Sequence, residues 1–251
     1  MAKPDYFCIV DTETTQPSPA NNDTGAEAIP AKVADFGAIV VNRKGDIMTQ
    51  CAVMVLGVYN NADKYPLFHI FGDDKDIWSK ASLPKRYDRY NKMLATGKRQ
   101  YASHNAINNW LAQVVGKYNP YLTAYNLSFD KDKCRNTDIN LDLFTKEFCL
   151  MKAACDKWAL TKKYRQFILD NHYFKPPTKY SNMSYLTKAE TMAHFVTGDD
   201  LVEPHTALED ARDFELPILL RLLATQKRKN WENPQGQSWQ QRQVKDWFIP
   251  K

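Results

Sequence analysis

Runs of hydrophobic residues separated by polar turns indicate an alternation of strands and helices along the chain. Residues 6–10 form a short apolar run that predicts a buried strand, and residues 33–41 and 47–55 predict two more. We expect these three strands to form an antiparallel meander. Two later runs, at 121–125 and 148–151, predict a fourth strand and a fifth, central one.

The last long helix is predicted to begin just after Thr206. Glu209 follows Thr206 by three residues and precedes the apolar run at 216–223, which is the pattern of a capping box with Thr206 at the N-cap. His205 and Asp210 then lie on either side of the cap. Because a helix N-terminus favours negative charge, Asp210 can stay ionised there as a metal or proton ligand. Taken alone, a histidine and a carboxylate at a cap are more often structural than catalytic.

Further carboxylates stand at the ends of predicted strands. Asp11 and Glu13 follow the first strand, and residues two apart in a strand face the same way. Asp130 lies in the first turn of the helix expected after the strand at 121–125. With Asp210 they make four carboxylates from three segments, which would raise one another's pKa if no cation were present. Such hard oxygen ligands suit Mg²⁺ or Mn²⁺.

The order of these residues resembles the three motifs of the DEDDh 3′-5′ exonuclease family. That family includes the proofreading subunit of bacterial DNA polymerase III, ribonuclease T and oligoribonuclease. The matching stretches are 11–15, 125–130 and 205–211, and the resemblance covers about residues 5–223. It implies an α/β, ribonuclease H-like fold, in which a mixed five-stranded sheet is flanked by helices.

The resemblance also implies a chemistry, which is the release of nucleoside 5′-monophosphates from the 3′ end of single-stranded DNA by a two-metal mechanism. Asp11, Glu13, Asp130 and Asp210 would bind two divalent ions, Mg²⁺ or Mn²⁺. Asp11 would bridge them. His205, with an ordinary pKa near 6.5, would take a proton from the attacking water.

Three further residues are assigned to the substrate by the same resemblance. Thr12 and Thr14 flank the carboxylates, where the terminal nucleotide is expected to bind. Asn126 is expected to orient the turn of Asp130 more than to contact a metal. Two other functions stay open: an exoribonuclease of the same fold, and a nucleic-acid-binding or scaffold module without catalysis. The presence of all four carboxylates and the histidine argues against the second of these.

Composition and charge indicate the type of partner and the cellular compartment. The chain has 251 residues, is 43% hydrophobic and carries a net charge of +5, which suits a nucleic acid partner with a free 3′ end. No apolar run approaches the length of a membrane span. Residues 1–4 pass straight into the first strand, so we expect no signal peptide and a cytoplasmic protein. The five cysteines are odd in number and lack Cys-x-x-Cys spacing, which predicts reduced thiols.

Several segments have two interpretations. The connection at 16–32 is either a flap that contacts substrate or a surface insertion. Residues 84–90 and 157–188 mix basic and aromatic residues, as single-strand binding surfaces do, but solvated helix faces with inward-packed aromatics have the same composition. Residues 103–109 imitate the second motif, but Asn109 stands where the carboxylate should be. We therefore expect that stretch to lie in a helix without a catalytic role.

Composition also divides the chain at about residue 224. Residues 1–224 carry all the motifs and form the expected exonuclease domain, in which the region 57–119 is enlarged. Residues 225–251 form a basic tail with a net charge of +4 and three of the six tryptophans. The tail is expected to bind nucleic acid or dock a replication or repair protein, or else to pack its tryptophans onto the body.

Overall fold

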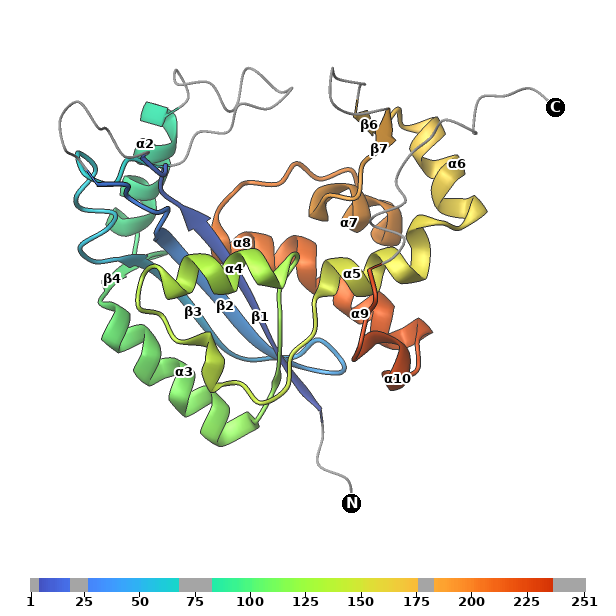
Figure 1. Ribbon diagram of the computed structural model, residues 1–251, viewed down its shortest axis with the longest axis horizontal. Coiled ribbons are helices and arrows are strands. Elements are labelled where there is room, and N and C mark those ends of the chain that lie inside the picture. Colours follow the sequence, from blue (N-terminus) through green and yellow to red (C-terminus); the bar gives the residue numbers. More distant parts are fainter. Residues whose placement is uncertain (1–4, 19–26, 68–82, 176–182, 237–251) are drawn as a thin grey trace.

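The computed structural model describes residues 5–18, 27–67, 83–175 and 183–236 (Figure 1). Its strands are β1 (Tyr6–Thr14), β2 (Val33–Asn42), β3 (Ile47–Val55), β4 (Gln100–Ala102), β5 (Tyr121–Thr123), β6 (Phe174–Lys175) and β7 (Ser184–Tyr185). Its helices are α2 (Leu83–Ala95), α3 (His104–Tyr118), α4 (Leu127–Arg135), α5 (Leu150–Ala154), α6 (Lys162–Asp170), α7 (Ala189–Thr197), α8 (Ala207–Asp210), α9 (Leu216–Thr225) and α10 (Arg228–Trp231), with a 3₁₀ turn at Leu141–Leu143 and π turns at Cys155–Ala159 and Ala211–Glu215.

The main sheet has five strands in the order β4-β3-β2-β1-β5. β2 is antiparallel to β1 and β3, while β1 pairs with β5 and β3 with β4 in parallel. β2 therefore runs against the other four strands. Helices flank the sheet, and α4 lies in front of it in Figure 1. This is the predicted α/β architecture, a mixed five-stranded sheet flanked by helices.

The predicted meander of the first three strands is confirmed, but β1 is longer than predicted. It continues through Thr14, with an irregularity in its pairing to β2 between Glu13 and Thr14. Asp11 and Glu13 therefore belong to the strand itself, and Asp11 lies opposite Gly37 of β2. Their spacing in a paired strand fixes both carboxylates on one face of the sheet.

The prediction of a central strand at 148–151 is wrong. Glu147 forms a single parallel bridge with Leu122, Phe148 donates its N–H to the Leu122 carbonyl, and the chain then enters α5 at Leu150. A short apolar run cannot be told from a buried helix by its pattern alone, and this one packs as a helix against α9. The fifth strand is β4, which comes from the enlarged 57–119 region and lies at the opposite edge.

The hydrophobic core lies on both faces of the sheet. Phe7 and Ile9 of β1 join the cluster formed with α5, α7 and α9, whereas Cys8 and Val10 join the cluster formed with α3 and α4. Because side chains alternate along a strand, Asp11 and Glu13 continue the face of Phe7 and Ile9 toward α8 and α9.

Several smaller predictions can be compared with these elements. Residues 103–109 do begin a helix, α3, with Ser103 as its N-cap. The connection at 16–32 is described only at its ends, where Ser18 and Ile29 form an antiparallel bridge. All five cysteines lie in the described ranges and are free thiols. Among the described residues, no helix combines the length and the apolar character needed to span a membrane.

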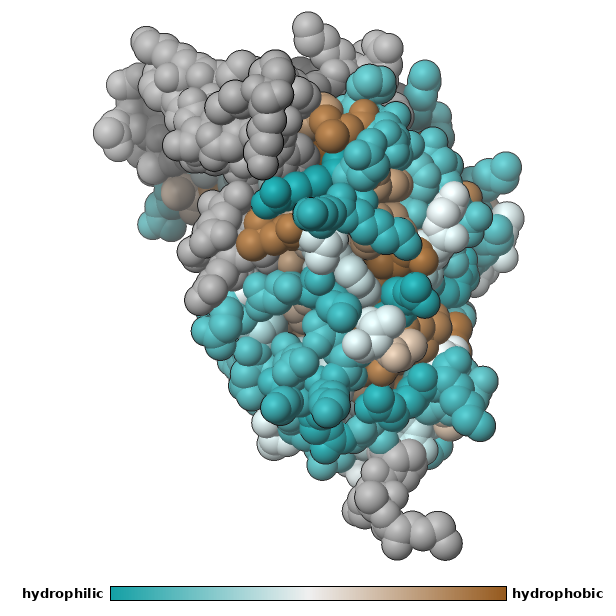
Figure 2. All heavy atoms as spheres, turned by 90° about the vertical axis from the view of Figure 1, so that its right-hand side faces the viewer, coloured by the Kyte–Doolittle hydropathy of each residue, from teal (hydrophilic) through white to brown (hydrophobic). Residues whose placement is uncertain are grey.

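The aromatic residues of the 157–188 region that the structure describes point inward. Trp158, Tyr164 and Tyr185 all belong to the core, so this part resembles a solvated helix face more than a stacking groove. Residues 176–182, which include the two prolines, lie outside the described ranges. The face that Figure 2 presents, the right-hand side of Figure 1, is mostly hydrophilic, with hydrophobic residues in small separate patches.

The first described part of the C-terminal tail packs onto the body. Trp231 of α10 is fully buried and its ring contacts those of Phe7, Tyr121 and Phe148. Trp239 and Trp247 lie outside the described residues.

The first turn of α8 lies directly on the backbone of β2. A Cβ atom built at Gly37 would be 2.2 Å from the Leu208 nitrogen and 2.3 Å from the Ala207 carbonyl carbon. No side chain fits between the two elements, so glycine at this position allows α8 to lie over the strand next to Asp11.

We therefore expect Gly37→Ala to lower the free energy of unfolding by about 1–3 kcal/mol, the usual cost of overpacking, because α8 must move away from β2. Urea unfolding measures this change. The matched control is Gly116→Ala in α3, where an added Cβ meets nothing within 4 Å. That variant should gain about 0.5–1 kcal/mol, the usual benefit of alanine over glycine in a helix. Equal stability of wild type and Gly37→Ala would contradict the close approach.

Candidate active site

The predicted catalytic residues lie where three segments meet. Asp11 and Glu13 stand on the last part of β1, and Asp130 lies in the first turn of α4, which follows β5. Asp210 ends α8, and His205 lies two residues before that helix begins. Because β1 and β5 are parallel, their carboxyl ends reach the same edge of the sheet, which is where α/β sheets bind their ligands.

The structure brings three of the five closest together. Glu13, His205 and Asp210 each offer a ligand atom, and these atoms lie within 4.8 Å of one another. The His205 Nδ1 atom is 4.0 Å from the Glu13 Oε1 atom. Asp11 and Asp130 lie outside this group. Burial raises the pKa of Asp11 most, and the charges of Glu215, Asp210 and Asp130 raise it further, so Asp11 is close to the other acids.

The carboxyl groups carry strongly raised pKa values. Burial is the largest cause at each of them, followed for Asp210 by the charges of Glu203 and Glu13. The pKa of Asp210 rises to about 10 and that of Asp130 to about 7. The Asp210 Oδ1 atom is buried and has no hydrogen-bond partner among the described residues. Crowded oxygen ligands with an unpartnered oxygen fit a hard divalent cation, whose charge would reverse these pKa shifts.

His205 is a weaker base than predicted. Burial, together with the nearby charges of Arg86, Lys188 and Arg89, lowers its pKa to about 3. The imidazole is therefore neutral at pH 7, but a weaker base than a solvated histidine. His205 also has a left-handed backbone, with φ of 53°, which turns the chain sharply into α8.

Two arginines of α2 reach the site, and the sequence analysis did not assign them. Arg86 Nη2 donates to Glu13 Oε2 at 2.8 Å, and Arg89 donates to the Pro204 carbonyl. They are three residues apart and so lie on one helix face, which is a signal that the sequence did contain. Tyr90 of the same stretch is buried, so its ring offers no stacking surface.

The three residues assigned to the substrate form local contacts. Thr12 Oγ1 donates to Asp130 Oδ1 at 2.8 Å, and Thr14 is buried. Asn126 precedes α4 with a left-handed backbone, and its carbonyl accepts from the Phe129 N–H at 2.8 Å. Thr12 and Asn126 thus help to position Asp130, and the substrate contacts of all three residues stay a prediction.

A buried ion-pair network places α8 over the sheet. Arg99 Nε lies 2.9 Å from Asp35 Oδ1, and Arg99 Nη2 lies 2.6 Å from Glu209 Oε2. The other oxygen of Asp35 accepts from the Ala207 N–H at 3.0 Å. Thr206 is the N-cap as predicted, but the capping box is wrong, because the Thr206 side chain makes no cap bond. Asp35 on β2 satisfies a helix N–H instead, and Glu209 pairs with Arg99.

Two more acidic residues, one of them fully buried, lie near the site and were missed. Glu203 precedes His205, and burial with the charge of Glu13 raises its pKa to about 8. Glu215 ends the π turn after Asp210 and is buried, with a pKa well above its ordinary value. Neither belongs to the motifs that the sequence analysis used.

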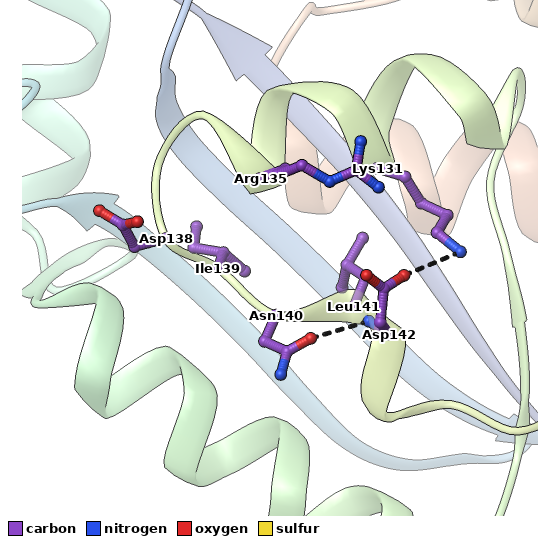
Figure 3. A pocket seen from close by; sticks show the side chains of 7 residues that line it. All are labelled: Lys131, Arg135, Asp138, Ile139, Asn140, Leu141 and Asp142. Carbon is purple, nitrogen blue, oxygen red and sulfur yellow. Dashed lines mark hydrogen bonds and ion pairs between the residues drawn. The ribbon is translucent and has the colours of Figure 1, made fainter.

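A separate hollow of about 260 Å³ lies beside α4 and the loop after it (Figure 3). Lys131 there pairs with Asp142 at 3.1 Å and Glu147 at 2.7 Å, so its charge is already compensated. None of the predicted site residues lines this hollow, and we assign it no function. Its lining residues are Lys131, Arg135, Asp138, Ile139, Asn140, Leu141 and Asp142.

Comparison with known proteins finds a structural likeness but no match in sequence. No protein-family model matches the chain, and no curated protein matches it in sequence. Among solved structures, the chain is similar to a 3′-exonuclease that recognises the 3′ end of a histone mRNA stem-loop. The two share 14% sequence identity, the match covers 89% of this chain and 84% of that one, and the TM-score is 0.47. We draw no functional conclusion from a likeness at this level.

The buried network leads to a stability prediction. Arg99→Met should lower the free energy of unfolding by about 3–5 kcal/mol, because it leaves Asp35 buried without its cation. Arg43→Met is the control, since Arg43 pairs with Asp5 at the surface and its side chain is 44% exposed. It should change stability by no more than about 1 kcal/mol. Urea unfolding of both variants checks this, and equal losses would contradict a special role for Arg99.

The raised pKa values lead to a second prediction. With EDTA present, the protein should lose stability as the pH rises from 7 to 9. Asp210, with a pKa of about 10, holds a proton that the unfolded chain released near pH 4. Its contribution to stability is complete below the unfolded pKa and is lost as the pH rises through the folded pKa. The slope is about 1.4 kcal/mol per pH unit for each carboxyl still protonated.

Urea unfolding at three pH values, with EDTA or with Mg²⁺, measures this slope. Mg²⁺ should remove much of the loss, because a cation stabilises the ionised carboxylates. Asp210→Asn should flatten the slope in EDTA. If the variant kept the slope of the wild type, Asp210 would not be the group that holds the proton.

Proposed function

We propose that the protein is a metal-dependent 3′-5′ exonuclease that hydrolyses single-stranded DNA and releases nucleoside 5′-monophosphates. The observation that carries this proposal is the group of Glu13, His205 and Asp210, whose ligand atoms lie within 4.8 Å of one another. Asp11 on the same strand as Glu13, and Asp130 at the start of α4, support it as nearby carboxylates. Carboxylates crowded to this degree are poorly stable without cations, and a phosphodiester is the substrate whose hydrolysis most needs cations.

The four carboxylates would hold two Mg²⁺ or Mn²⁺ ions. Bound together, two such ions neutralise the charge of a phosphodiester and stabilise the attacking and leaving oxygens. Asp11 lies among the other acids, since its pKa is raised by burial and then by the charges of Glu215, Asp210, Asp130 and Glu13, which supports its role as the shared ligand. Thr12 would hold Asp130 in place through its hydroxyl, which donates to that carboxylate.

His205 would accept a proton from the attacking water. Its neutral imidazole can receive one, but burial and, after it, the charges of Arg86, Lys188 and Arg89 make it a weak base in the free protein. The phosphates of a bound strand would compensate these three cations and raise the pKa of His205 toward the range of a general base. The same cations would then attract the strand to the site.

The proposed substrate is a strand with a free 3′ end. Thr14 and Asn126, with Thr12, stand at the carboxyl end of β1 and at the start of α4, where a terminal nucleotide would contact them. The tail from residue 225 is proposed to dock a replication or repair protein or to bind nucleic acid. Its positive charge supports either role.

A degradation ladder tests the proposed function. Single-stranded DNA and RNA oligonucleotides labelled at the 5′ end are incubated with the protein and Mg²⁺ or Mn²⁺, or with EDTA. We expect shortening from the 3′ end that needs the cation and is faster on DNA. Asp11→Ala should abolish hydrolysis, and His205→Ala should lower turnover by roughly 10²-fold or more, the usual scale for loss of a general base.

Asp213→Asn is the matched control, because Asp213 lies in the neighbouring π turn but pairs with Arg212 at 2.7 Å on the surface. It should leave hydrolysis unchanged. Faster shortening of RNA would replace the DNA assignment by an exoribonuclease. Binding of oligonucleotides without cleavage would replace the enzyme by a binding module, and full activity of His205→Ala would rule out the histidine as base.

A further inference from the structure

Glu215 is a buried carboxyl that the proposed function leaves without a role. Its side chain is 2% exposed, and its Oε2 atom has no hydrogen-bond partner among the described residues. Burying an ionisable group without partners costs free energy of folding. An acidic residue at such a place therefore calls for a ligand or a proton.

The π turn determines where this carboxyl points. In a regular α-helix a residue five positions after Asp210 would point about 140° away from it. Glu215 instead ends a π turn, in which the hydrogen bonds join residues five apart, and this brings it back toward the side of Asp210. Pro217 follows at once, and its ring would clash with the carbonyl of Asp213 in a tighter helix, which favours the wider turn.

The neighbours of Glu215 come from two strands of the sheet, β5 and β1. The Tyr125 backbone, at the point where β5 passes into the turn before α4, lies near enough to lower the pKa of this carboxyl, which burial raises. The π turn also packs against β1. Among charged neighbours, Glu215 raises the pKa of Asp11 most, and Asp130 raises that of Glu215 most. The carboxyl thus lies on the Asp11 and Asp130 side of the site.

We propose that Glu215 is a ligand for a divalent cation, in a subsite that it shares with Asp11 and Asp130. This subsite would lie beside the group of three residues whose ligand atoms are within 4.8 Å of one another. The inference rests on the proposed function, which calls for cations here, and it adds a carboxylate that the family motifs do not contain. Mg²⁺ and Mn²⁺ accept this all-oxygen ligand set, with water completing the coordination.

Titration with Mn²⁺, followed by the electron paramagnetic resonance signal of the free ion, tests the proposal without any substrate. Glu215→Gln keeps the shape of the side chain and removes its charge. We expect it to weaken the binding of at least one Mn²⁺ by about 10-fold to 100-fold. Asp213→Asn, an exposed carboxyl of the same turn, should bind Mn²⁺ like the wild type.

Unchanged Mn²⁺ affinity and stoichiometry in Glu215→Gln would overturn the proposal, because a purely structural side chain would give that result. Urea unfolding in EDTA shows whether the variant folds. If it does not, Glu215→Asp serves instead, since it keeps the charge but withdraws the carboxylate. Weaker Mn²⁺ binding in that variant supports the proposal, and equal binding overturns it.

The oligonucleotide ladder of the wild type separates this inference from the proposed function. Hydrolysis by the wild type together with unchanged Mn²⁺ binding in Glu215→Gln would remove the inference and keep the exonuclease. Weakened Mn²⁺ binding in the variant, with no hydrolysis of either polymer by the wild type, would keep Glu215 as a ligand and remove the exonuclease.

Discussion

The candidate site depends on the contact between the start of α8 and the middle of β2. Gly37 lets the helix backbone touch the strand, and Asp35 on the same strand accepts the N–H of Ala207. Arg99 pairs with both Asp35 and Glu209, and the side chains of Arg99 and Asp35 are fully buried. Because a helix pressed onto a strand has few ways to tilt, this contact fixes the positions of His205 and Asp210 opposite β1.

The closely spaced acidic residues of the site reduce the stability of the folded protein. The same closeness that aligns the acids also raises their pKa values, and the nearest compensating cation is Arg86, which already contacts Glu13. Under the proposed function, this arginine would neutralise one carboxylate in the free protein and would bind a phosphate of the strand when that carboxylate holds a metal ion.

Local patterns in the sequence predicted local features well. The alternation along β1 placed Asp11 and Glu13 on one face, and the residues around Thr206 located the start of α8. The partners of the cap could not be predicted, because Arg99 and Asp35 are 64 residues apart and no periodicity connects them. Tertiary packing selected Arg99 in place of the capping box.

The remaining errors have related causes. Residues 148–151 are apolar enough for either a strand or a buried helix, and packing against α9 decided for the helix. Glu215 was missed because a spacing of five places it on the opposite face of an ordinary helix from Asp210. The π turn that reverses this is favoured by Pro217, but a proline at this position does not by itself distinguish a π turn from a kink.

The burial of Trp231 has a practical consequence for shortened versions of the protein. The change in composition near residue 224 suggests a natural place to truncate the chain. A fragment that stopped there would leave the rings of Phe7, Tyr121 and Phe148 exposed to water, because Trp231 covers them. Since Phe7 lies in the strand that carries Asp11, the minimal folding unit includes α10, and compositional and folding boundaries do not coincide.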